Sequence, residues 1–189
     1  GITLGRLQQL LSEHGQFLAL DPPLPDRTTL GGTLATGASG PLKWMYGSPR
    51  DVVIGMKVVQ ADGTVTKSGG QVVKNVSGYD MTRLHVGGLG TLGVIAEVSL
   101  KLTPLPAGQA TVVAEYASVG GALAASLDIF HGDAVPLAVA AIDAAAGRRM
   151  DAPGLGGGSF LSVRLGGRPL TLERQIKECR SACQAHGPS

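Results

Sequence analysis

The segment from residue 85 to residue 102, HVGGLGTLGVIAEVSLKL, contains a G-x-G-x-x-G pattern with glycines at Gly88, Gly90 and Gly93. This pattern marks a Rossmann dinucleotide site only when a strand precedes the first glycine and a helix begins at the last. Here the alternating residues 94–102 predict a strand after the glycines, and residues 79–85 predict a helical turn before them, with Leu84 inward. The order is reversed, so we reject the Rossmann interpretation.

Composition sets the class of protein. The 189 residues are 43% hydrophobic and 16% charged, which allows a buried core in one or two domains. A net charge of +2 with dispersed basic residues gives no reason to propose nucleic acid or a membrane surface as the main partner. There is no signal peptide and no apolar run near 18 residues, so a cytoplasmic protein without membrane insertion is expected. The start at Gly1, without methionine, suggests a fragment.

The two cysteines give no metal site by their spacing. Cys179 and Cys183 stand four residues apart, with neither a second pair nor a histidine cluster nearby. We interpret them as two reduced thiols on one helical face and predict no metal.

The first half of the chain predicts an α+β fold with many glycine breaks. Thr3 is a candidate cap for a helix that ends near Gly15. The strand 52–60, a return strand 64–68 and the strand 94–102 predict a mixed or antiparallel sheet within residues 1–105. Residues 24–49 are expected to be mostly loop, and a loop of this length is usually functional.

The pattern changes after Pro104 and Pro106 to β-α-β and then β-α, which resembles part of a ferredoxin-like domain. We expect strands at 111–116, 137–142 and 159–165 and helices at 119–130 and 170–185. Arg148, Arg149 and Asp151 are expected in a solvated turn, and the glycines at 154–158 in a flexible connection. The predicted domains are residues 1–106 and residues 107–189.

Several motifs follow one another in the first domain: Pro22-Pro23, Thr29-Leu-Gly-Gly-Thr-Leu-Ala-Thr-Gly-Ala-Ser-Gly40, Tyr46-Gly-Ser-Pro-Arg-Asp51, Val58-Val-Gln-Ala-Asp-Gly63, Lys74-Asn-Val-Ser-Gly-Tyr-Asp80 and Gly88-Leu-Gly-Thr-Leu-Gly-Val-Ile95. Together they resemble the FAD-binding domain (PCMH-type) of the vanillyl-alcohol oxidase and p-cresol methylhydroxylase flavoprotein family. Residues 69–80 are most similar to the FAD-binding E-type subunit of bacterial glycolate oxidase. The D-type subunit and FAD-dependent D-lactate dehydrogenases share the Gly-Tyr-Asp core.

The resemblance implies FAD as cofactor and places two loops beside it. The first loop would contribute Pro22, Pro23, Thr28, Thr29, Gly31, Gly32, Ala35, Thr36, Ala38, Ser39 and Gly40. The second would surround the adenine end with Gly88, Gly90, Thr91, Gly93, Val94 and Ile95. Glycines allow close approach to backbone N–H groups, and Thr and Ser hydroxyls can donate to phosphate or ribityl oxygens. The alternative is that these segments are only tight turns between strands.

Alanine substitution separates these two interpretations. If the cofactor approaches the glycine backbone, alanine weakens FAD binding more than folding; if only positive φ is needed, the apo fold loses stability. We expect the first outcome at Gly32 and Gly93 and a mixture of both at Gly31.

Other polar residues are interpreted as structural. Arg50 and Asp51 are expected to fix the loop before the strand 52–60, and Asp80 to anchor the turn into Arg83. His85 is expected to be packed or exposed and not a base.

The sequence departs from the family pattern in three ways. An N-terminal subdomain with a second glycine-rich loop normally grips the pyrophosphate, and residues 1–189 are not expected to supply it. The C-terminal substrate domain, with its acid-binding arginines and catalytic histidines, would be cut short. Gly-Gly-Leu-Gly at 87–90 stands where relatives often have Gly-Ser-Glu-Gly. We therefore assign no catalytic residue and expect the chain alone to be inactive, and colourless or weak in FAD binding. Trp44 and Tyr46 are expected in the core, with the border of the flavin ring as the alternative.

Three hypotheses for function remain. The first is the FAD-binding subunit of a glycolate oxidase-like complex that oxidises a small 2-hydroxy acid, passes a hydride to FAD and delivers electrons to other subunits, including an iron-sulfur electron-transfer subunit. The second is a non-catalytic module that binds FAD or a partner. The third is a degenerate fragment of a D-lactate dehydrogenase-like flavoprotein.

Overall fold

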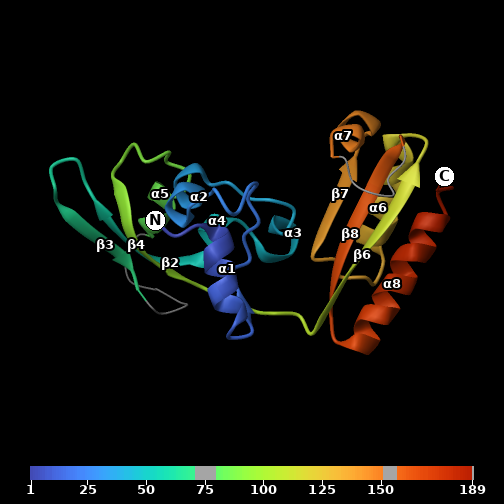
Figure 1. Cartoon of the computed structure of the whole chain (residues 1–189), viewed down its shortest axis with the longest axis horizontal. Coiled ribbons are helices and arrows are strands. Elements are labelled where there is room, and N and C mark those ends of the chain that lie inside the picture. The colour runs from blue at the N-terminus through green and yellow to red at the C-terminus, as the bar shows by residue number, and fades with distance from the viewer. Residues whose placement is uncertain (71–79, 151–156, 189) are drawn as a thin grey trace. The chain divides into compact units, whose positions relative to one another are not determined.

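The structure is a computed structural model that describes residues 1–70, 80–150 and 157–188. The chain forms two compact units, Gly1–Leu105 and Pro106–Ser189, and each is described by itself (Figure 1). Most of the motif from Lys74 to Asp80 lies outside the described residues, as do Asp151 and part of the glycine run at 154–158.

The first unit combines short helices with two small antiparallel sheets. Its elements are α1 (Leu4–Ser12), β1 (Gln16–Phe17), α2 (Leu30–Thr36), α3 (Lys43–Tyr46), α4 (Pro49–Val52), β2 (Val53–Val59), β3 (Val65–Gly69), α5 (Thr82–His85), β4 (Val94–Leu100) and β5 (Thr103–Pro104). One sheet has the order β3-β2-β4, and the other pairs β1 with β5. The predicted α+β class and the predicted antiparallel sheet are confirmed.

The core of this unit lies where α1 and α2 pack on β2. Leu4 of α1, Leu34 of α2, and Met56 and Val58 of β2 are each at most 3% exposed. The predicted cap is confirmed, because the Thr3 side chain accepts a hydrogen bond from the backbone N–H of Arg6 at 3.3 Å.

A bulge in β4 overturns the alternation that the sequence suggests. The pairing of β4 with β2 shifts after Lys57, which leaves Ala96 as an extra residue. Ile95 therefore packs against the core, whereas Val94 is 70% exposed. A bulge moves the residues before it to the opposite face, and period-two reasoning cannot detect this.

Residues 24–49 are mostly loop, as expected, although the short helices α2 and α3 interrupt them. Two further expectations for this unit are wrong. Leu84 is 50% exposed, while its neighbour Val86 is buried. Trp44 is also exposed, at 54%, so the core assignment fails there. Tyr46 is half-buried and meets Phe17 edge-to-face, with ring centroids 5.5 Å apart.

The second unit is a three-stranded antiparallel sheet with two helices over one face. Its elements are β6 (Gly108–Tyr116), α6 (Val119–His131), β7 (Ala138–Ile142), α7 (Ala144–Arg149), β8 (Ser159–Gly167) and α8 (Pro169–Gln184). The sheet order is β6-β8-β7 (Figure 1). Leu161, Val163 and Leu165 of β8 have no exposed surface and pack with α6 and α8.

The expected order of elements in this unit is present, with one addition. Arg148 and Arg149, expected in a solvated turn, end helix α7. The Asp143 side chain caps this helix by accepting from the N–H of Ala146 at 2.7 Å. Cys179 and Cys183 are buried free thiols on α8, as expected.

Candidate functional site

The first predicted cofactor loop is organised around the start of α2. The Thr29 side chain caps this helix by accepting from the N–H of Gly32 at 3.1 Å. The N–H of Gly31 has no hydrogen-bond partner among the described residues. A Cβ at Gly31 would meet nothing within 4 Å, and its φ is not positive. The fold itself therefore gives no reason for glycine at Gly31, and the mixed effect expected of alanine at this position is revised to an effect on FAD binding alone.

Other glycines in the predicted set are explained by the fold. Gly93 has φ of 146°, and its Cβ would lie 2.6 Å from Val58 Cγ1 and 2.7 Å from the carbonyl oxygen of Val59. A Cβ at Gly40 would collide with the backbone and carboxylate of Asp21. The expectation that alanine at Gly93 affects the cofactor more than folding is therefore revised, since close backbone contact with β2 already requires glycine there.

The structure brings the two predicted loops together. The N–H of Gly87 donates to the carbonyl of Leu34 at 2.9 Å, and the N–H of Leu89 donates to the carbonyl of Ala35 at 2.7 Å. The C-terminal end of α2, with Ala35 and Thr36, thus adjoins the loop that carries Gly88, Gly90 and Thr91. Residues far apart in the sequence thus lie side by side, and we call α2 together with the loop 87–93 the rim.

Backbone strain marks both loops. Leu24 and Leu89, with φ of 54° and 53°, are the non-glycine residues with positive φ in the described ranges. Leu24 follows Pro22-Pro23, and Leu89 lies between Gly88 and Gly90. Both side chains are exposed, so core packing does not account for the strain. Strained residues of this kind concentrate at functional sites.

Several hydroxyls predicted to reach the cofactor are already used within the protein. Thr28 donates to the carbonyl of Pro23 at 2.8 Å, Thr36 to that of Gly32 at 2.8 Å, and Thr91 to that of Gly88 at 2.7 Å. The Thr29 hydroxyl only accepts, and the half-buried Ser39 side chain makes no hydrogen bond within the described part of the chain. Thr29 and Ser39 are thus the hydroxyls in this set with a proton to offer a ligand.

The remaining predicted residues show no strain and no free side-chain hydroxyl. Pro22 is buried, Pro23 is exposed, and the N–H of Ala38 donates to the carbonyl of Thr33 at 3.1 Å. Val94 and Ile95 lie in β4, which has one strand neighbour in the described sheet. Half of the β4 backbone groups therefore face away from β2.

Sequence reasoning missed Asp21. Its carboxylate accepts the N–H groups of Gly40 and Leu42, each at 3.0 Å. Because these partners lie 19 and 21 residues downstream, no local pattern reveals the contact. Asp21 thereby joins the two ends of the first predicted loop.

The carboxylates interpreted as structural make hydrogen bonds within the fold. Asp51 accepts from the backbone N–H and the hydroxyl of Ser48, both at 2.7 Å, and these hydrogen bonds lower the pKa of Asp51. Asp80 accepts from Thr82 and, at 2.9 Å, from Arg83, and the Thr82 hydroxyl is the largest cause of its lowered pKa. Arg50 donates to the carbonyl of Val86 at 3.2 Å, which ties α4 to the end of α5.

A cavity of about 350 Å³ adjoins the second loop. Met56 and Val58 of β2, His85 of α5 and Leu92 of the glycine loop are among its lining residues, together with polar side chains of β3 such as Thr66 and Ser68. Apolar walls with a few polar groups are typical of small-molecule sites.

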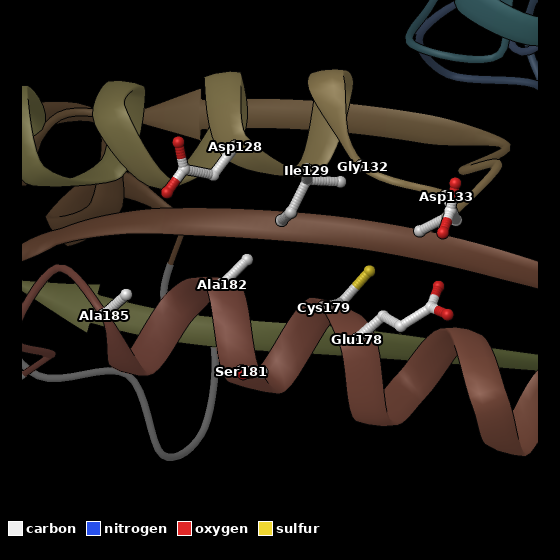
Figure 2. Close-up of a pocket in the computed structure, with 10 residues that line it drawn as sticks. Asp128, Ile129, Gly132, Asp133, Glu178, Cys179, Ser181, Ala182 and Ala185 are labelled. Atoms are coloured by element: carbon white, nitrogen blue, oxygen red, sulfur yellow. The ribbon is translucent and has the colours of Figure 1, made fainter.

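A second cavity, of about 370 Å³, lies in the other unit between α6 and α8 (Figure 2). Asp128 pairs with His186 at 2.7 Å, and Glu178 pairs with Arg174 at 2.8 Å. Burial raises the pKa of the Cys179 thiol to about 11, so it is protonated and not a nucleophile near neutral pH. No group of three metal-ligating side chains occurs in the described ranges. This cavity therefore offers little chemistry.

Comparison with known proteins identifies a domain family for most of the first unit. Residues 1–69 match the model of the FAD binding domain family. Glycolate oxidase subunit GlcD of Bacillus subtilis is 37% identical over 142 residues, 75% of this chain and 30% of that protein. Glycolate oxidase subunit GlcE of Escherichia coli is 41% identical over 107 residues, 56% of this chain and 31% of that protein.

A mitochondrial D-lactate dehydrogenase [cytochrome] of Arabidopsis thaliana is 41% identical over 119 residues, 63% of this chain and 21% of that protein. The solved structure of alkyldihydroxyacetonephosphate synthase shares the fold, with a TM-score of 0.81 and 20% identity over 99% of this chain and 38% of that one. The chain thus spans about a third or less of the length of these curated relatives.

No helix in the described ranges is long and apolar enough to cross a membrane. FAD, the cofactor implied by the sequence motifs, is the cofactor of the matched domain family. Residues 1–69 therefore belong to the FAD binding domain family, of the PCMH type that the sequence motifs indicate.

Proposed function

We propose that the first unit binds part of FAD along the rim formed by α2 and the loop 87–93. The observation that carries this proposal is Gly31, a helical glycine with open space before it and a free N–H in the described structure. Gly31 lies in the first turn of α2, where a backbone N–H has no intrahelical partner, and the missing side chain leaves that N–H open to a ligand that approaches the backbone.

The residues at this rim fit a phosphate-containing cofactor. The N–H of Gly31 and the hydroxyls of Thr29 and Ser39 would hold oxygens of FAD without adding charge. The hydrogen bonds from Gly87 and Leu89 to α2 would keep the second loop at a fixed distance from these groups. When bound, FAD supplies the acceptor for the hydride that leaves the hydroxyl-bearing carbon of a 2-hydroxy acid.

We further propose that the complete protein is the FAD-binding subunit of a glycolate oxidase-like complex. The similarity to two glycolate oxidase subunits supports a small 2-hydroxy acid as substrate. It also supports other subunits as partners. We propose that one of them is an iron-sulfur subunit that accepts the electrons, as the resemblance of the sequence motifs implies. The substrate acid would leave as a 2-oxo acid, with its hydroxyl proton passing to a base outside the residues assigned here.

A non-catalytic FAD-binding module is the second candidate. One observation favours it: neither His14 nor His85 makes a side-chain hydrogen bond within the described residues of the first unit. A general base is ordinarily oriented by a neighbouring group, so these histidines lack the usual arrangement.

Two measurements test the proposal in order. Flavin fluorescence during titration with the purified chain reports binding; we expect saturable but weak binding of FAD and none of riboflavin, which lacks phosphates. The absence of saturable FAD binding both in this chain and in a chain extended upstream of Gly1 contradicts the cofactor site. The second measurement adds glycolate or D-lactate to the bound flavin in the presence of the other subunits. Loss of the flavin absorption, which marks its reduction, supports the oxidase. Bound flavin that no 2-hydroxy acid reduces favours the non-catalytic module.

A further inference from the structure

Asp21 follows a buried segment that is neither helix nor strand. Leu18 and Leu20 are at most 3% exposed. The side chain of Gln8 on α1 satisfies their backbone, because its Oε1 accepts from the N–H of Leu18 at 3.0 Å and its Nε2 donates to the carbonyl of Leu18 at 2.6 Å. Burial and these hydrogen bonds fix the point from which the Asp21 side chain extends.

The Asp21 carboxylate uses its two oxygens on two different partners. Oδ1 accepts from the N–H of Gly40 and Oδ2 from the N–H of Leu42, each at 3.0 Å. Leu42 is itself buried, with 6% of its surface exposed. Hydrogen bonds to an ionised carboxylate are stronger than neutral ones, so this contact holds the returning chain firmly.

Gly40 fits this contact and no larger residue would. The position that a Cβ would take at Gly40 is filled by Asp21, whose Oδ1 would lie 2.7 Å away. The carboxylate and the glycine are therefore complementary in shape as well as in hydrogen bonding. The segment from Pro22 to Gly40, which this contact closes, contains every residue of the first predicted cofactor loop.

We infer that Asp21 is a positioning residue for cofactor binding: it fixes Pro22-Pro23 against Ala38–Gly40 and so orders the loop before FAD arrives. A loop that is ordered in advance loses less conformational entropy on binding, which raises affinity without any new contact. This inference rests on the proposed function and adds a residue that does not itself touch the cofactor.

The test compares two substitutions of graded severity. Asp21→Asn keeps the volume but offers one acceptor oxygen, so one of the two N–H groups loses its partner; Asp21→Ala removes both. We expect faster hydrogen exchange at Gly40 and Leu42 in both variants, and exchange in β2 unchanged. The FAD dissociation constant should rise about tenfold for Asp21→Ala and less for Asp21→Asn. At saturating FAD the flavin absorption spectrum should match that of the wild type, because no contacting atom is lost.

The matched control is Asp62→Asn. Asp62 also accepts a backbone N–H, that of Thr64 at 2.9 Å, but in the hairpin turn between β2 and β3. Its replacement should leave FAD affinity unchanged. All titrations are made at a temperature where circular dichroism shows each variant folded, and the milder Asn variant serves if the Ala variant does not fold.

The outcomes separate this inference from the proposed function. A wild type that does not bind FAD, either as this chain or as a chain extended upstream of Gly1, contradicts the proposed function itself. A wild type that binds FAD, with Asp21 variants that bind equally well, overturns this inference alone, and so does a lowered melting temperature with unchanged affinity. Weaker binding in the order wild type, Asn, Ala, together with faster exchange at Gly40 and Leu42, supports it.

Discussion

Different kinds of contact stabilise the fold within each of the two units. In the first, irregular segments follow a path set by individual polar contacts, such as Asp21 with Gly40 and Arg50 with Val86. In the second, β6 and β8 pair along nine residues each, and alternating β8 side chains are fully buried. Apolar burial therefore stabilises the second unit, whereas the path of the irregular segments in the first unit depends on single hydrogen bonds. Such bonds can fix the groups of a ligand site in defined positions.

The largest effect is expected in the core of the second unit. Leu161→Ala removes a side chain with no exposed surface, and should reduce the free energy of unfolding by about 2–5 kcal/mol. Urea unfolding followed by circular dichroism measures this loss. FAD affinity at a temperature where the variant is folded should not change; if it fell, the functional division between the units would be wrong.

Gly93 provides the corresponding test in the first unit. Gly93→Ala places a methyl group against β2 at a φ that alanine rarely adopts, and should cost about 1–3 kcal/mol of apo stability. The apo melting curve is the measurement. Unchanged stability would mean that Gly93, like Gly31, owes its identity to a ligand.

The contrast between the units also explains how far the sequence could be interpreted. In the second unit, runs such as Leu161, Val163 and Leu165 reveal strands directly, because one face is buried throughout. Even so, α7 was missed, although Asp143 is a good cap, because six residues are too few to show helical periodicity.

In the first unit, the sequence predicted the sheet but not the details that shape the site. The bulge at Ala96 reversed the faces at the start of β4, and the contact from Asp21 to Gly40 spans 19 residues. The motifs indicated two loops as candidates; the structure then separates Gly31, whose surroundings are open, from Gly93, which packs against β2. Long-range backbone contacts of this kind leave no local pattern.

A smaller effect is expected from pH. The pKa of Asp51 lies below its ordinary 3.8 in the folded chain, mainly through the Ser48 hydroxyl. A lowered folded pKa stabilises the protein above about pH 4, and this stability is lost as pH falls through the folded pKa. Asp51→Asn should cost about 1 kcal/mol at pH 7 and flatten the acid side of the stability curve. If the stability of Asp51→Asn between pH 7 and pH 2 fell with the wild-type slope, the stabilising role of the Asp51–Ser48 hydrogen bonds would be contradicted.

The smallest effect on folding, and the most direct test of the cofactor site, is expected at Gly31. The measurement is a FAD titration of Gly31→Ala paired with its apo melting curve. The added methyl group meets no protein atom within 4 Å and improves helix propensity, so the melting temperature should stay equal or rise. FAD affinity should fall at least tenfold, because the methyl group occupies the space through which the cofactor approaches. Unchanged affinity at Gly31→Ala would contradict the placement of FAD along this rim.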